Sequence, residues 1–216
     1  MIGDVQTTDF ACNAGGLPRN LATQLAKRCP MSHDIKLLDD STRPKAEKLV
    51  ITSERQREAG RHLAQIHNHF RDHMALLRRL LDRVEKGEAT PEALREQTEA
   101  MPMLSNYRRF GTLCGQHCRI IEMHHSIEDQ ALFPRLRSKN EGLKRVVDRL
   151  IAEHEVVHAL LLRLVEASGA LVRDPVPDNF TAARALYETF ESVLLSHLGY
   201  EEDEIGDAIG YYNIAL

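Results

Sequence analysis

From about residue 53 to residue 206, apolar residues recur at intervals of three, four and seven. This period is typical of amphipathic helices, and no segment shows the strict alternation of a strand. The pattern predicts a first helix over about 53–86, which Gly87 ends. Three more helices are predicted, from about Ser105 to Leu132, over about 142–170 and over about 179–206.

Short breaks separate these segments. The strings "SKNEG" and "RDPVPD" divide the last three helices, and Asp178 is a good N-cap for the fourth. A short linking helix is expected between the first two long ones, from Thr90 to Pro102. Long amphipathic helices with short links predict an all-α, antiparallel up-down four-helix bundle over residues 51–216. Residues 1–50 form an N-terminal extension, irregular or weakly helical.

Composition agrees with a packed domain and narrows the function. Of 216 residues, 43% are hydrophobic and 28% charged, which suits a core of this kind. A net charge of −4 gives no general case for nucleic-acid binding. No apolar run reaches the roughly 18–20 residues of a membrane span, and the N-terminus lacks a secretory signal. We therefore expect a cytoplasmic protein that binds neither nucleic acid nor membrane.

Histidine is the unusual component of the chain. There are eleven, and ten of them follow residue 60. Three of the predicted helices carry a pair of polar residues four apart on the apolar face: His124 with Glu128, His154 with His158, and His197 with Glu201. Residues at this spacing lie one turn apart on one face, roughly 6 Å along the axis. Such a pair can bind two adjacent metal ions, or bridge them.

The spacing of these pairs along the chain tests whether they share one level of the bundle. The pairs centre on residues 126, 156 and 199. In an up-down bundle, groups at one level lie equally far from the turn between their helices. The two midpoints, residue 141 and the bond between 177 and 178, fall inside the two breaks. One common layer of polar side chains is predicted.

The first helix offers three histidines to that layer, His67, His69 and His73. His69 lies off the apolar stripe. His73 would sit roughly 9 Å too far along the axis, at 1.5 Å per residue. His67 is therefore preferred, with His73 as the alternative.

The set then contains five imidazoles and two carboxylates. Imidazole suits Fe, Zn, Cu and Ni. If both carboxylates and one further oxygen bridge two octahedral ions, a single coordination position stays open. An open position inside an apolar bundle suits a small neutral molecule.

Four local strings, "IHNHFRDHM", "HHSIEDQALFPRL", "EHEVVHALLLRL" and "SHLGYEEDEI", carry a resemblance to a known family. Together they span about 65–206, and their order is similar to that of the hemerythrin-like HHE cation-binding proteins. The resemblance implies a non-haem centre of two Fe ions with an oxo or hydroxo bridge. It carries over onto His67, His124, Glu128, His154, His158, His197 and Glu201. The spacing in oxygen-carrying hemerythrins would choose Glu202 in place of Glu201.

Neighbouring polar residues receive other roles. His125 points about 100° away from His124 around the helix, which predicts a surface residue or one that supports a ligand. Asp129 is placed to hydrogen-bond a ligand imidazole and orient it. His117 is expected to line the core or a pocket, and Glu153 to be solvated. Cys118, like Cys114 one turn before it, is expected to pack in the core.

Two kinds of function fit this site. Ferritin-like oxidases use Glu-x-x-His pairs and more carboxylates, so the His-rich set argues against them. One candidate is an enzyme that decomposes peroxide or metabolises NO under oxidative or nitrosative stress. The alternative is a protein that binds, stores or senses O2 or NO without turnover. We prefer the first, because apolar residues of the extension, such as Leu37 and Leu38, predict that it packs over the bundle and restricts access.

Overall fold

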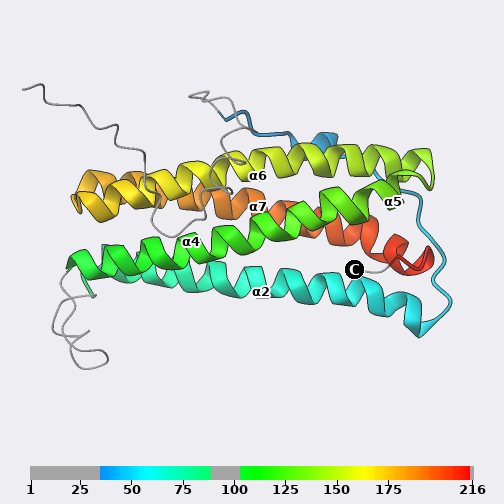
Figure 1. Ribbon diagram of the computed structural model, residues 1–216, viewed down its shortest axis with the longest axis horizontal. Coiled ribbons are helices and arrows are strands. Elements are labelled where there is room, and N and C mark those ends of the chain that lie inside the picture. Colours follow the sequence, from blue (N-terminus) through cyan, green and yellow to red (C-terminus); the bar gives the residue numbers. More distant parts are fainter. Residues whose placement is uncertain (1–34, 89–102, 215–216) are drawn as a thin grey trace, which may run out of the picture.

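The computed structural model describes residues 35–88 and 103–214, and the side chains of the second range from residue 115 onward. Its four long helices are α2 (Glu54–Glu85), α4 (Met103–Ile127), α6 (Glu141–Arg173) and α7 (Pro177–Tyr211), as Figure 1 shows. The described residues contain no strand, and the predicted all-α four-helix bundle is confirmed. The expected linking helix lies outside the described residues.

The helices form a closed ring of neighbours. Helix α2 packs against α4 and α7, and α6 packs against the same two helices from the other side. Ser53 caps α2 through a capping box with Gln56. The prediction that Asp178 caps the last helix is wrong. The N-cap is Val176, because Pro177 takes the first helical position and places Asp178 inside the first turn.

Two apolar clusters fill the bundle, one on each side of a polar layer. One cluster contains Phe70, Ile121 and Leu194. The other contains Leu63 and Leu150. On every helix the predicted metal ligands fall between members of the two clusters. The histidines and carboxylates are therefore buried by apolar side chains above and below them.

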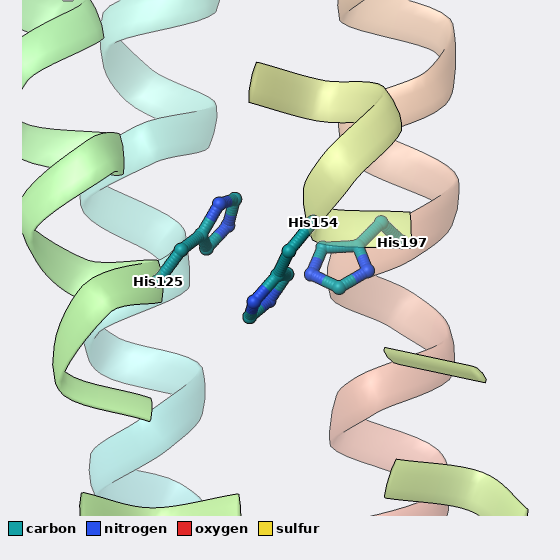
Figure 2. Close-up of side chains that lie close together, drawn as sticks. All are labelled: His125, His154 and His197. Carbon is teal, nitrogen blue, oxygen red and sulfur yellow. The ribbon is translucent and has the colours of Figure 1, made fainter. Parts of the chain in front are cut away.

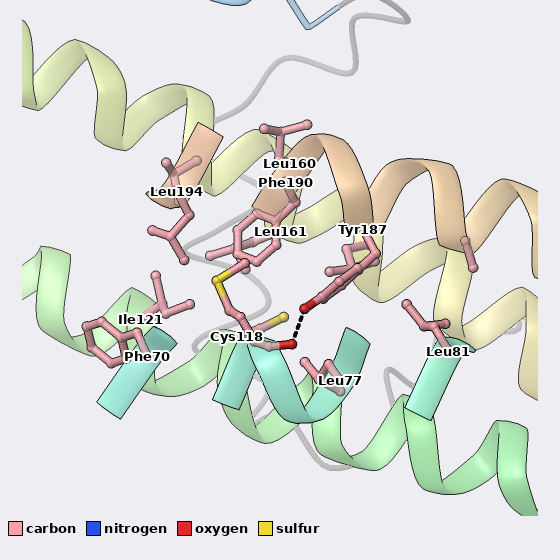
Figure 3. Packing of buried hydrophobic residues seen from close by; sticks show 14 of the residues in the cluster. Phe70, Leu77, Leu81, Cys118, Ile121, Leu160, Leu161, Tyr187, Phe190 and Leu194 are labelled. Carbon is pink, nitrogen blue, oxygen red and sulfur yellow. Dashed lines mark hydrogen bonds between the residues drawn. The ribbon is translucent and has the colours of Figure 1, made fainter. Parts of the chain in front are cut away.

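Figure 3 shows the first of these clusters. Cys118 lies within it, as predicted, and is 6% exposed. The Tyr187 hydroxyl donates a hydrogen bond of 2.5 Å to the carbonyl oxygen of Met74, which ties α7 to α2. The ring of Tyr187 is fully buried, so packing is the role that the structure gives it.

Helix α4 is followed by a change of helical winding at the level of the buried histidines and carboxylates. After α4, residues Glu128–Leu132 form a π-helical turn, η2, and Phe133–Arg137 form the short helix α5. The N–H of Phe133 bonds to the carbonyl of Glu128, five residues back. Pro134 follows and cannot donate a backbone hydrogen bond. Such turns are frequent at functional sites, and this one begins at a predicted ligand.

Residues 35–52, here called the strap, run beside α6 and α7 before the chain enters α2 (Figure 1). The strap contains one short 3-10 turn, η1 (Asp40–Thr42). The Tyr200 hydroxyl donates to the carbonyl of Pro44 at 2.8 Å, and the Ala46 N–H donates to Glu204 at 2.7 Å. Part of the predicted extension is thus fixed to the side of the bundle. Residues 1–34 lie outside the described part of the chain.

Candidate metal centre

Seven buried side chains form two groups of potential metal donors. The first, called the mixed group, consists of His67, His124, Glu128 and Glu201. The second, called the histidine group, consists of His125, His154 and His197. Within each group the donor atoms lie within 4.8 Å of one another. Figure 2 shows that the three rings of the histidine group come from α4, α6 and α7 and turn toward one another.

The two carboxylates join the groups. Glu128 places Oε1 3.1 Å from His124 Nε2 and Oε2 3.7 Å from His154 Nε2. Glu201 places Oε2 3.5 Å from His67 Nε2 and 3.6 Å from His197 Nε2. Each carboxylate therefore faces one imidazole of each group. The two carboxylates therefore lie between the mixed group and the histidine group.

A close approach of two helices brings part of the mixed group together. An added Cβ on Gly60 of α2 would lie 2.9 Å from the carbonyl oxygen of Gly206 on α7. A larger residue at Gly60 would force the backbones apart, whereas a Cβ on Gly206 would meet the Cα of Gly60 at an ordinary 3.7 Å. His67 and Glu201 lie a few residues away on the same two helices. The glycine at position 60 thus permits the close approach of α2 and α7 near these ligands.

Three carboxylates lie within hydrogen-bond distance of the Nδ1 atoms of three imidazoles. His67 Nδ1 lies 2.8 Å from Glu202 and His154 Nδ1 lies 2.9 Å from Asp129. His197 Nδ1 lies 3.0 Å from Glu153. In each pair Nδ1–H donates to the carboxylate, which fixes the tautomer and leaves the Nε2 lone pair for a metal. The predicted orienting contact of Asp129 is confirmed.

Glu153 corrects a prediction. It was expected to be solvated, but it is only 4% exposed. Arg43 of the strap donates to it at 2.9 and 3.1 Å, and Arg149 donates at 2.6 Å. The sequence pattern did not reveal this burial, because the strap that covers Glu153 lies 110 residues away along the chain. Burial alone would raise the pKa of Glu153, but hydrogen bonds from His197 and the two arginines lower it to about 2.

Many polar atoms at the centre have no hydrogen-bond partner within the described chain. These atoms are the two carboxylate oxygens of Glu128, the two of Glu201, and the Nε2 atoms of His125, His154 and His197. Each buried atom of this kind is costly unless something binds it. Their lone pairs converge on one small volume. Imidazole and carboxylate donors in this arrangement fit a pair of transition-metal cations.

The protonation states agree with that fit. Burial, followed by neighbouring charges, lowers the pKa of both His67 and His124 to about 3. Burial also lowers the pKa values of His125 and His154 well below the usual range. These imidazoles are therefore neutral, the form that binds a metal. Burial raises the pKa of Glu128, with Glu201 adding to the rise, as expected for two close buried carboxylates.

The structure brings together six of the seven residues predicted as ligands. His158 lies outside both groups; its Nε2 is 2.9 Å from Glu122 and 3.4 Å from His125 Nδ1. On α2 it is His67, not His73, that lies in the mixed group. On α7 it is Glu201, whereas Glu202 contacts the outer nitrogen of His67.

His125 is the residue that sequence reasoning missed. A surface position was one expectation for it, but its side chain is fully buried and its ring stacks on that of His154, with centroids 3.9 Å apart. Helix α4 packs against both α2 and α6. His124 therefore faces α2, while the neighbouring face, 100° around the helix, is also buried. Two adjacent histidines inside an apolar run were the available signal.

Comparison with known families agrees with this geometry. The family model described as "Hemerythrin HHE cation binding domain" matches residues 59–209, which include every residue of the two donor groups. Comparisons with curated proteins and with solved structures found no match. None of the described helices is long and apolar enough to cross a membrane. By its family match, its bundle and its buried histidines and carboxylates, the chain belongs to the hemerythrin family of HHE cation-binding domains.

Proposed function

We propose that this protein holds two iron ions and uses them to decompose hydrogen peroxide, or to react with NO or O2, under oxidative or nitrosative stress. The ligands in this proposal are the seven predicted residues, His67, His124, Glu128, His154, His158, His197 and Glu201, with His125 beside them. The observation that carries it is the bridging position of Glu128 and Glu201 between two sets of imidazoles.

His125 and His158 share the last imidazole position in this proposal. His154 and His197 serve one ion in either case. Because Nδ1 of His125 and Nε2 of His158 are 3.4 Å apart, a small rotation of one ring changes which of them faces the centre. The imidazole that is not a ligand stays beside the site, next to Glu122.

Bound iron would supply the change of oxidation state that peroxide or NO chemistry requires. The surrounding chain supplies the rest. Decomposition of peroxide converts two H2O2 into two H2O and one O2, so protons leave the molecule that is oxidised and reach the one that is reduced. A carrier that releases O2 unchanged has no such need.

Glu122, a buried carboxylate beside His158, is the side chain that can take up and return these protons. His125 is a neutral imidazole, which carries a proton on one nitrogen and a lone pair on the other. Glu122 Oε2 lies 2.9 Å from Nε2 of His158. The two apolar clusters exclude bulk water, so proton transfer depends on these side chains. This set of groups favours turnover over simple O2 carriage.

Oxygen evolution from added peroxide tests the proposal. Iron-loaded protein is expected to release one O2 for every two H2O2 consumed, whereas chelated protein should release none. Glu122→Gln is expected to keep its iron and lose activity several-fold, while the exposed Glu188→Gln serves as the matched control. Reversible spectral change between air and argon, with no turnover of peroxide or NO, would reject the proposal and establish the binding alternative.

A further inference from the structure

A second pair of histidines repeats the first on the same two helices. His67 on α2 and His124 on α4 have ring centroids 5.2 Å apart, in edge-to-face contact. His73 on α2 and His117 on α4 have ring centroids 5.6 Å apart, also in edge-to-face contact. The proposed function uses the first pair only. The second pair has no role in it.

The second pair lies farther along the same two helices than the first. His73 is six residues after His67, and His117 is seven before His124, so both steps are roughly 9–10 Å along antiparallel helices. Phe70 lies between the pairs, with its ring centroid 5.1 Å from that of His124 and 6.3 Å from that of His117. One aromatic ring therefore separates the second pair from the mixed group.

A pocket opens at the second pair. Its volume is about 380 Å³, and its walls include His73, His117 and Gln116. Leu76 and Met123 also line it and are 45% and 59% exposed, which places this pocket at the surface of the α2–α4 face. The pocket thus connects the outside of the bundle with the second histidine pair.

His117 is the buried polar group in this pocket. It is 2% exposed, yet neither ring nitrogen has a hydrogen-bond partner within the described residues. Burial, followed by the charges of His73 and His69, lowers its pKa to about 3, so it is neutral. A neutral ring does not attract an anion but presents a lone pair to a cation. Arg119 is the one cation that lines the pocket, and Asp72 is an acid that acts on His73.

The ring separations fit a shared metal ion. A metal–imidazole bond is roughly 2.0–2.1 Å, so two rings on one ion have centroids at most roughly 6 Å apart. The 5.6 Å of His73 and His117 meets this limit. His69, one turn before His73, has its centroid 4.1 Å from that ring but does not join the pair in a group of three donors within 4.8 Å of one another. Imidazole donors select divalent transition metals over Mg²⁺ and Ca²⁺.

We infer that His73 and His117 form an outer site for one divalent transition-metal ion, which receives the ion from solvent and passes it to the buried centre. The outer site itself stands on the pocket and the unpartnered His117. Its loading role rests on the proposed function of the buried centre. Phe70 is the ring that lies between the outer site and the mixed group, in contact with both His117 and His124.

Counting bound Co²⁺ tests the outer site independently of the buried one. Wild-type protein is expected to bind one Co²⁺ more than His73→Ala, measured by calorimetry and by the visible absorption of the ion. His62→Ala is the matched control, an exposed histidine on the same helix, and should bind as the wild type does. An equal number of ions on wild type and His73→Ala would overturn the outer site.

Two further variants separate the inner and outer sites. His117→Gln should also lose one ion, and because His73 is partly exposed, the test still holds if the buried substitution fails to fold. His154→Ala should lose ions from the buried centre but keep the outer one. For the loading role, His73→Ala should fill its buried centre with Fe²⁺ several-fold more slowly and reach the same final content. An unchanged filling rate would overturn the loading role alone.

Discussion

Glu153 Oε2 lies 3.0 Å from Nδ1 of His197, and this contact connects the strap to the buried centre. Arg43 of the strap and Arg149 of α6 bind the same carboxylate. A charged acceptor makes the imidazole of His197 a stronger ligand. Residues far outside the ligand set therefore act on how strongly the centre holds a metal.

Replacing the charge at Glu153 tests this connection. Glu153→Gln keeps the size of the side chain but removes the negative charge that faces His197, so iron affinity should fall by about 10–100-fold. The melting temperature should fall as well, because Arg43 and Arg149 lose their common partner. Competition with a chelator measures the affinity. Unchanged competition relative to the wild type would show that Glu153 has only a structural role.

The shared position of His125 and His158 makes a prediction about redundancy. His125→Ala and His158→Ala should each bind two irons at saturation, but more weakly than the wild type, because the remaining imidazole takes the position. The double variant should hold a single iron at the same concentration. Elemental analysis across an iron titration distinguishes these cases. If one single variant alone lost the second iron, the residue replaced would be a dedicated ligand.

Metal removal should weaken the fold. The oxygens of Glu128 and Glu201 and the Nε2 atoms of the histidine group are buried together without a hydrogen-bond partner, and a bound cation would satisfy them. A ligand present at 1,000 times its dissociation constant adds about 4 kcal/mol to the free energy of unfolding. Chelated protein should therefore melt roughly 10 °C below the iron-loaded form in calorimetry. Equal melting temperatures would place the metal outside the core.

The stability of the chelated protein should fall as the pH drops from 7 to 5. His67, His117 and His124 have pKa values near 3 when folded and an ordinary value of 6.5, so below pH 6.5 the unfolded chain binds more protons. Each contributes a loss of roughly 1.4 kcal/mol per pH unit. The raised pKa values of Glu128 and Glu201 act in the opposite direction but concern fewer groups.

Thermal unfolding of chelated protein across this pH range checks the sign. His117→Gln removes one of the titrating imidazoles without touching a proposed ligand of the buried centre, so its stability should depend less steeply on pH. A melting temperature that stays constant or rises toward pH 5 would contradict the buried, neutral state of these histidines.

Much of the fold could be predicted, because helical periodicity depends on local sequence. The level of the polar layer was also predictable, since the turns at 138–140 and 174–176 lie close to the calculated midpoints. Glu153 and His125 were not predictable in this way. Their burial depends on what covers a second face of the helix, and a single stripe of residues carries no information about that.

The histidines of α2 show what residue counting can predict and what it cannot. Counting residues from the turn identified His67 as the member of the polar layer, and the structure places it in the mixed group. The same counting placed His73 and His117 roughly 10 Å from that layer, without relating them to each other. Only the packing of α2 on α4 brings their rings within 5.6 Å.

The central claim is that Glu128 and Glu201 bridge two iron ions in one buried centre. The most direct measurement is the iron content per chain of purified, iron-loaded protein, with folding monitored by circular dichroism. His73→Ala, which lacks only the outer site, should hold two irons, both in the buried centre, and the wild type should hold at least these two. Glu201→Ala should hold fewer while it remains helical. One iron or none on folded wild-type protein would contradict the account.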